Sequence, residues 1–82
     1  MPTIFRDKGY RFFFYSNEGD PLELCHVHIR QGRSVAKFWM IPFVSLENSY
    51  GFSPVELRKL AEIVDQNQNL IERKWNEYFG TH

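Results

Sequence analysis

The segment LCHVHIRQGRSVAKFWM constrains the fold most strongly, because two runs of alternating apolar residues meet at Gly32. A glycine followed by one other residue suits a type II′ turn, which joins two antiparallel strands. With Gly32 as the first turn residue, His28 faces Lys37 and His26 faces Trp39. A shift of one residue would place Lys37 on the apolar side, and the cost of burying its charge argues against that register.

This register divides the predicted hairpin into an apolar face and a polar face. The first holds Cys25, Val27, Ile29, Ala36, Phe38 and Met40, and the second holds His26, His28, Arg30, Val35, Lys37 and Trp39. An apolar sheet face requires a second layer that covers it. The sequence therefore predicts that another element packs on this side of the sheet.

Other segments predict further strands. Thr3 to Arg6 and Tyr10 to Tyr15 read as a hairpin around the turn formers Asp7 to Gly9. The second of these segments, YRFFFY, is largely apolar on both faces, which is typical of a strand with neighbours on both sides. Residues 16 to 21 are predicted as a loop, and residues 42 to 51 as a connecting segment with room for a short strand at Phe43 to Ser45.

The last third of the chain predicts a helix with a well-marked start. Ser53 is the expected N-cap, Pro54 the first helical residue, and Glu56 the second half of a capping box. Helical apolar spacing continues to about Phe79, which gives one helix about 39 Å long, and a bend at Asn67 to Asn69 is the alternative.

The elements together predict an α+β fold. We expect a small antiparallel sheet of three to five strands, followed by one long C-terminal helix packed on one face. A chain of 82 residues normally builds one core, so residues 1 to 82 are expected to form a single domain.

Composition excludes several classes of protein. Ten basic and ten acidic residues give a net charge of zero, which argues against a protein that coats nucleic acid by bulk charge. The single cysteine, the absence of an apolar leader and the absence of a long apolar run favour a cytoplasmic protein without a membrane segment.

Several motifs occur in an order that resembles a known family. They are MPTIF-R with GYRFFFYSNEGD, HVHIR followed by AKFW, GFSPVELRKL, and the ending WNEYFG. Together they resemble the small bacterial family catalogued as domain of unknown function 4160 over nearly the whole chain. The resemblance implies a small bacterial protein that is often encoded beside another small protein, and that is sometimes described as one half of a toxin–antitoxin pair.

The polar face of the hairpin carries the candidate chemistry. His26, His28 and Arg30 alternate on one strand and project from one face about 7 Å apart, with Lys37 and Trp39 on the neighbouring strand. Two imidazoles suit proton transfer, the two cations suit phosphate, and an indole stacks on a base. The hypothesis is RNA binding or cleavage, and the alternative is a solvated sheet face or histidines packed under the helix.

The same residues predict no metal and no cofactor. Two histidines on one strand provide two ligands, but a third would have to come from Glu18, Asp20 or Glu23 in the preceding segment. Cys25 is expected to be an inert core thiol.

A second hypothesis is a protein-interaction module. A helix longer than the sheet leaves part of its apolar stripe uncovered, around Ile71, Trp75, Tyr78 and Phe79. Such a stripe predicts a protein partner or a homo-oligomer. Whether the protein is an enzyme stays open at this point.

Overall fold

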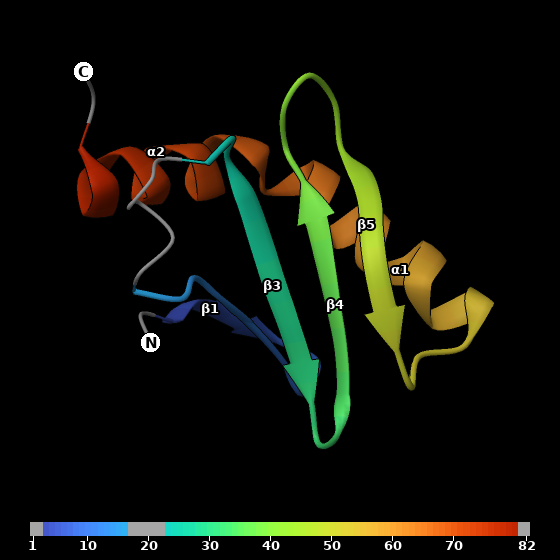
Figure 1. Cartoon of the computed structure of the whole chain (residues 1–82). Coiled ribbons are helices and arrows are strands. Elements are labelled where there is room, and N and C mark those ends of the chain that lie inside the picture. Colours follow the sequence, from blue (N-terminus) through green and yellow to red (C-terminus); the bar gives the residue numbers. More distant parts are fainter. Residues whose placement is uncertain (1–2, 17–22, 81–82) are drawn as a thin grey trace.

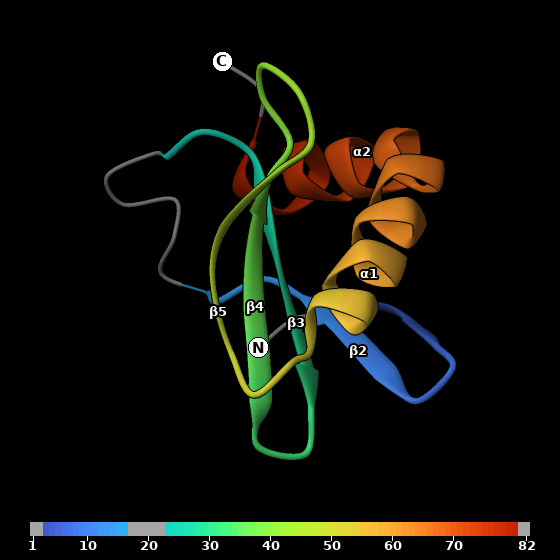
Figure 2. The ribbon, with the colours of Figure 1, turned by 90° about the vertical axis from the view of Figure 1, so that its right-hand side faces the viewer.

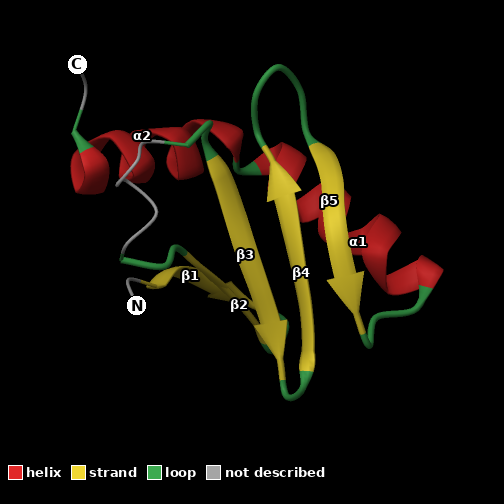
Figure 3. Ribbon diagram, in the orientation of Figure 1, coloured by secondary structure: helices red, strands yellow, loops and turns green. Residues whose placement is uncertain are grey.

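Five strands form one antiparallel sheet, and two helices cover one of its faces in the computed structural model, which describes residues 3–16 and 23–80 (Figures 1, 2 and 3). Each strand pairs with the next one along the chain. The elements are β1 (Thr3–Asp7), β2 (Tyr10–Phe13), β3 (His26–Gln31), β4 (Ser34–Trp39), β5 (Ser45–Tyr50), α1 (Pro54–Gln66) and α2 (Gln68–Phe79). The α+β class and the antiparallel sheet are thereby confirmed.

The predicted register of the central hairpin is confirmed. His28 pairs with Lys37 and His26 with Trp39 across β3 and β4. Gly32 has a φ of 60°, as the first central residue of a type II′ turn requires. In the β1–β2 hairpin, Lys8 and Gly9 both have positive φ, at 53° and 84°, which is the pattern of a type I′ turn.

Strand β5 corrects the prediction of a connecting segment over residues 42 to 51. Ser45–Tyr50 pairs with β4, and a bulge separates the pairs of Lys37 and Phe38. Its side chains are mostly exposed, so the segment lacks the apolar alternation that signals a strand. Main-chain hydrogen bonding to β4 defines this strand, and the short strand considered at Phe43 to Ser45 lies too early in the chain.

The main core lies between the sheet and the helices. Its fully or largely buried members are Tyr10, Phe12, Phe14, Val27, Ile29, Ala36, Phe38, Met40, Leu60, Ile63, Val64, Ile71 and Trp75. Phe13 is also buried, but it lies outside this core and contacts Tyr15 and His28 on the opposite face. Strand β2 is therefore apolar on both faces, as predicted, and lies between β1 and β3.

The helical region consists of two helices that meet at an angle, which corrects the prediction of one long helix (Figure 2). The break is at Asn67, where a bend was the alternative. The Asn67 side-chain amide donates to the carbonyl oxygen of Ile63 at 2.7 Å, and its backbone N–H donates to Val64 at 3.1 Å. These bonds satisfy carbonyl groups that the end of α1 would otherwise leave unpaired.

The predicted start of α1 is confirmed. The Glu56 backbone N–H donates to the Ser53 hydroxyl oxygen at 3.1 Å, and the Ser53 backbone N–H donates to the Glu56 carboxylate at 3.0 Å. This reciprocal pair is the capping box, with Pro54 at the first helical position. Most of the loop predicted over residues 16 to 21 lies outside the described residues.

Candidate functional site

One face of the sheet is turned away from both helices (Figure 2) and is called the open face below. Strand pairing assigns side chains to it, because residues directly opposite each other in a sheet share a face. Its members on the five strands include Arg6, Arg11, Phe13, His26, His28, Arg30, Val35, Lys37, Trp39, Asn48 and Tyr50. The predicted polar face of the hairpin is thus the middle of a larger surface.

A pocket of ≈ 260 Å³ opens on this face. It is lined by Tyr15, His28, Arg30, Val35, Ala36, Lys37 and Asn48. Three of the predicted site residues, His28, Arg30 and Lys37, therefore meet at one place. The other two residues of that hypothesis, His26 and Trp39, do not line the pocket.

Aromatic side chains hold the ring of His28 at the pocket. Phe13 stacks beside it, with ring centroids 5.6 Å apart, and Tyr15 meets it edge-on at 4.5 Å. The ring of His26 lies 5.1 Å away on the same strand. These ring contacts restrict the rotation of the His28 imidazole and hold it in place at the pocket.

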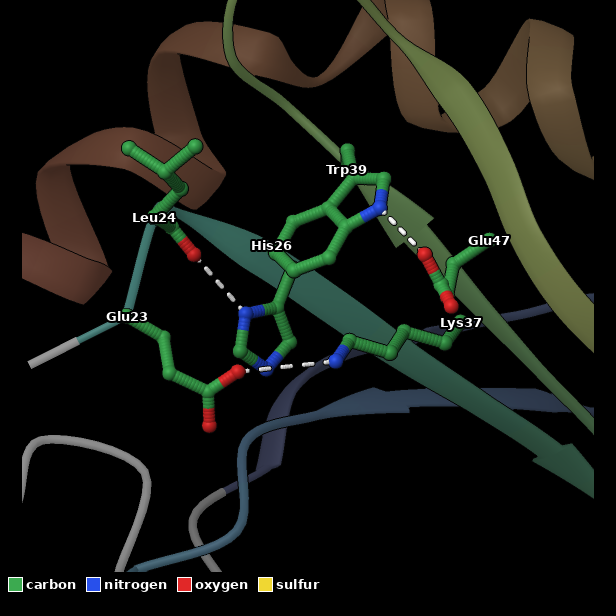
Figure 4. A network of polar contacts seen from close by, with 6 residues as sticks. All are labelled: Glu23, Leu24, His26, Lys37, Trp39 and Glu47. Carbon is green, nitrogen blue, oxygen red and sulfur yellow. Dashed lines mark hydrogen bonds and ion pairs between the residues drawn. The ribbon is translucent and has the colours of Figure 1, made fainter. Parts of the chain in front are cut away.

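His26 is fully buried, which corrects its expected place on an accessible surface. Its Nδ1–H donates to the carbonyl oxygen of Leu24 at 2.8 Å (Figure 4). Its ring packs against Trp39, at 5.3 Å between centroids, and against Trp75 of α2, at 5.0 Å. Strand pairing puts His26 on the open face, where Trp39 and Trp75 of α2 cover its ring, so it is a packed histidine, as the alternative predicted.

Lys37 is held by a carboxylate and an indole (Figure 4). Its Nζ lies 3.6 Å from the Glu23 carboxylate and 4.4 Å from the ring centroid of Trp39. The Trp39 indole N–H in turn donates to Glu47 at 2.6 Å. The indole predicted to stack on a base therefore also makes a cation–π contact with the lysine ammonium.

The predicted partner stripe on the helix is mostly internal. Ile71 and Trp75 belong to the main core, with 0% and 5% of their surface exposed, so their expected exposure is wrong. The physical reason is the bend at Asn67, which folds α2 across the sheet. Tyr78 remains 47% exposed, and Phe79 is half-buried against Phe14 and Trp75.

Cys25 packs against the main core, as expected for an inert thiol. Burial raises its pKa from 9.0 to about 12, and the nearby negative charge of Glu72 adds to this effect. Both causes disfavour the thiolate, which is the reactive form.

We expect native Cys25 to react with a disulfide reagent at pH 8 about 50-fold more slowly than in the unfolded chain, because three pKa units reduce the thiolate fraction about a thousandfold and the greater nucleophilicity of the more basic thiolate offsets only part of that loss. The native rate should rise with pH. The contribution of Cys25 to stability should fall as pH rises from 9 towards 12, since in that range the thiol ionises in the unfolded chain and stays protonated in the folded one. Stopped-flow absorbance measures this thiol alone, because the chain has one cysteine. A native rate within tenfold of the unfolded rate would contradict the expected burial effect.

No metal centre is evident in the described ranges 3–16 and 23–80, where no three His, Cys, Asp or Glu side chains are grouped to hold an ion. Glu18 and Asp20, considered as ligands, lie outside these ranges. Within the same residues, neither helix has the length and apolar character needed to cross a bilayer.

Sequence reasoning missed two polar residues that line the pocket, Tyr15 and Asn48. Tyr15 could have been found, because it continues the alternation of Arg11 and Phe13 beyond the end of β2. Asn48 lies on β5, which has no alternating pattern, and pairs with Lys37. Its position became apparent only from the pairing of β4 with β5.

Comparison with known proteins identifies the family. Neither a search of curated proteins nor a search of solved structures found a match. A family model described as a domain of unknown function matches residues 9–76. Since that match covers most of the chain, the protein belongs to the DUF4160 family.

Proposed function

We propose that this protein binds single-stranded RNA through the open face, with the pocket as the centre of the site. The observation that carries the proposal is the meeting of His28, Arg30 and Lys37 in one pocket, with Tyr15 and Asn48 beside them. These side chains come from three strands and the residues that follow β2. The pocket therefore exists only in the folded protein.

The residue types at the pocket suit an unpaired nucleotide. Aromatic rings stack on bases of any sequence, and Arg and Lys bind phosphate oxygens through charge-assisted hydrogen bonds. An Asn side chain offers both donors and an acceptor to a base edge. A sheet face with this combination is a common platform for single-stranded RNA, whose bases are accessible, whereas the major groove of an RNA duplex is too narrow to read.

The proposal gives the two histidines different roles. His28 lines the pocket and contacts the ligand, whereas His26 is buried beside His28, with the two ring centroids 5.1 Å apart. Cleavage that relies on both imidazoles requires both to reach the reacting atoms, and the burial of His26 argues against it. RNA binding is therefore favoured over the two-histidine version of RNA cleavage.

Fluorescence anisotropy with a labelled single-stranded RNA of about 12 nucleotides tests the proposal. Each phosphate contact contributes about 0.7 to the slope of log K against log salt for single strands. Losing one contact should therefore weaken binding about eightfold at about 50 mM salt, relative to 1 M, where the electrostatic contribution vanishes. We expect this loss for Arg30→Gln and for Lys37→Gln.

Two further variants sharpen the test. Glu23→Gln should strengthen binding, because it removes the carboxylate that competes with phosphate for Lys37. Arg58→Gln is the matched control, since Arg58 is an exposed arginine on α1, away from the open face. No saturable binding by the wild-type protein at about 50 mM salt would overturn the proposal, as would equal effects of Arg30→Gln and Arg58→Gln.

Protein binding, as in one half of a toxin–antitoxin-type pair, is a second candidate. It is supported by a separate pocket of ≈ 320 Å³ between the N-terminal strands and α2, which is lined by Thr3, Ile4, Phe14, Lys74, Glu77 and Tyr78. Tyr78 is the member of the predicted partner stripe that this pocket includes. Failure of RNA binding in the anisotropy experiment would leave this function as the better hypothesis.

A further inference from the structure

Three arginines lie side by side on the open face. Arg6 of β1 pairs with Arg11 of β2, and Arg11 pairs in turn with Arg30 of β3. Because paired residues share a face and neighbouring strands lie about 4.8 Å apart, the backbone positions of this arginine row span about 10 Å. The row crosses the three strands and does not follow any one of them, so no single stretch of sequence contains it.

Like charges directly opposite each other destabilise a sheet, so the arginine row costs stability in the isolated protein. Two contacts hold Arg11, the middle residue of the row, in place. The guanidinium of Arg11 lies 4.6 Å from the ring centroid of Phe13, and its Nε–H donates to the Thr3 hydroxyl at 2.8 Å. Arg6 and Arg30 are exposed, and the salt bridges among the described residues involve neither of them.

The arginine row is continuous with the pocket. Arg30 is both the last member of the row and a residue that lines the pocket, where it meets His28 and Lys37. The whole chain has a net charge of zero, so this local excess of positive charge is not a consequence of a basic composition. Successive phosphates of a stacked single strand rise by about 3.4 Å, so the row of about 10 Å spans about three such rises, or about four phosphates.

We propose that the arginine row is the track of the RNA site for the RNA backbone. It binds successive phosphates of an RNA strand that crosses β1, β2 and β3, while one nucleotide of that RNA occupies the pocket. This inference rests on the proposed function and extends it to Arg6 and Arg11. It also gives the path of the bound RNA, which runs across the β-strands towards the edge of the sheet at β1. Charge complementarity between three adjacent guanidinium groups and a phosphodiester chain supports this occupant.

The salt dependence of RNA binding tests the track with the same labelled RNA. Arg6→Gln and Arg11→Gln should each lower the slope by about 0.7 and weaken binding about eightfold at about 50 mM salt, and the double variant about 60-fold. Arg6→Lys and Arg11→Lys retain the charge and should retain most of the slope. Far-UV circular dichroism checks that each variant is folded, which matters most for Arg11 because of its contacts with Thr3 and Phe13.

The outcomes separate the track from the proposed function. If the wild-type protein binds no RNA, both fail. If Arg30→Gln and Lys37→Gln reduce the slope while Arg6→Gln and Arg11→Gln match the Arg58→Gln control, the track is overturned and the pocket stands. If polyglutamate displaces the RNA as well as unlabelled RNA does, the row recognises acidic polypeptide, and the RNA assignment is overturned.

Discussion

Trp75→Ala is expected to destabilise the protein by about 3–5 kcal/mol, the usual cost of truncating a buried tryptophan. Trp75 is 5% exposed. The centroid of its ring lies 5.2 Å from the ring centroid of Phe14, 4.3 Å from that of Phe79 and 5.0 Å from that of His26. A chain of this length has a total stability of about 4–12 kcal/mol. The variant should therefore be largely unfolded or unfold at much lower denaturant, as chemical denaturation followed by far-UV circular dichroism would measure.

Tyr78→Ala is the matched control, because Tyr78 lies on the same helix and is 47% exposed. Its expected cost is about 1 kcal/mol or less, since little buried surface is lost. Trp75→Phe should lie between the two, because it keeps an aromatic ring in the core. A loss of stability for Trp75→Ala no larger than for Tyr78→Ala would mean that Trp75 lies on the surface, as the sequence-based prediction of a partner-binding stripe requires.

Gly51→Ala should destabilise the protein by about 2–4 kcal/mol, through backbone strain and overpacking together. Gly51 has a φ of 88°, and a Cβ atom there would lie 2.5 Å from the Ser34 hydroxyl oxygen and 3.1 Å from the Ser34 Cα. One of these atoms belongs to the backbone of β4, so rotation of a side chain cannot remove the whole clash. Thermal or chemical denaturation measures the effect.

Gly32→Ala isolates the contribution of backbone strain. Gly32 also has a positive φ, but nothing lies within 4 Å of a Cβ atom built there. Its expected cost is about 1–2 kcal/mol. Ser34→Ala should partly rescue Gly51→Ala by removing the hydroxyl oxygen, and equal losses at Gly32 and Gly51 without such rescue would contradict the steric argument.

Much of the fold could be predicted from turns, caps and strand alternation, because each of these features depends only on residues that are close together in the sequence. The turn at Gly32 and the alternation on both sides of it were enough to pair His28 with Lys37. The capping box at Ser53 located the start of α1 at Pro54. Strand β5 was missed because its side chains are exposed and its pairing with β4 leaves no pattern in its own sequence.

The candidate site was predictable in part for the same reason. The face that carries His28, Arg30 and Lys37 follows from the alternation of one hairpin. The burial of His26 does not, because it results from contact with Trp75, which lies 49 positions later in the chain and reaches the hairpin only through the packing of α2.

Turn geometry, capping and strand alternation act over a few residues, so the register of the central hairpin, the capped start of the helical region and the residues of the polar face followed from the sequence. Which of those residues remain accessible, where the helix breaks, and the alignment of Arg6, Arg11 and Arg30 in one row depend on the folded chain. The physical reason is that burial and pairing across strands depend on distant segments. Their free energies are set by packing in three dimensions, which no local pattern records.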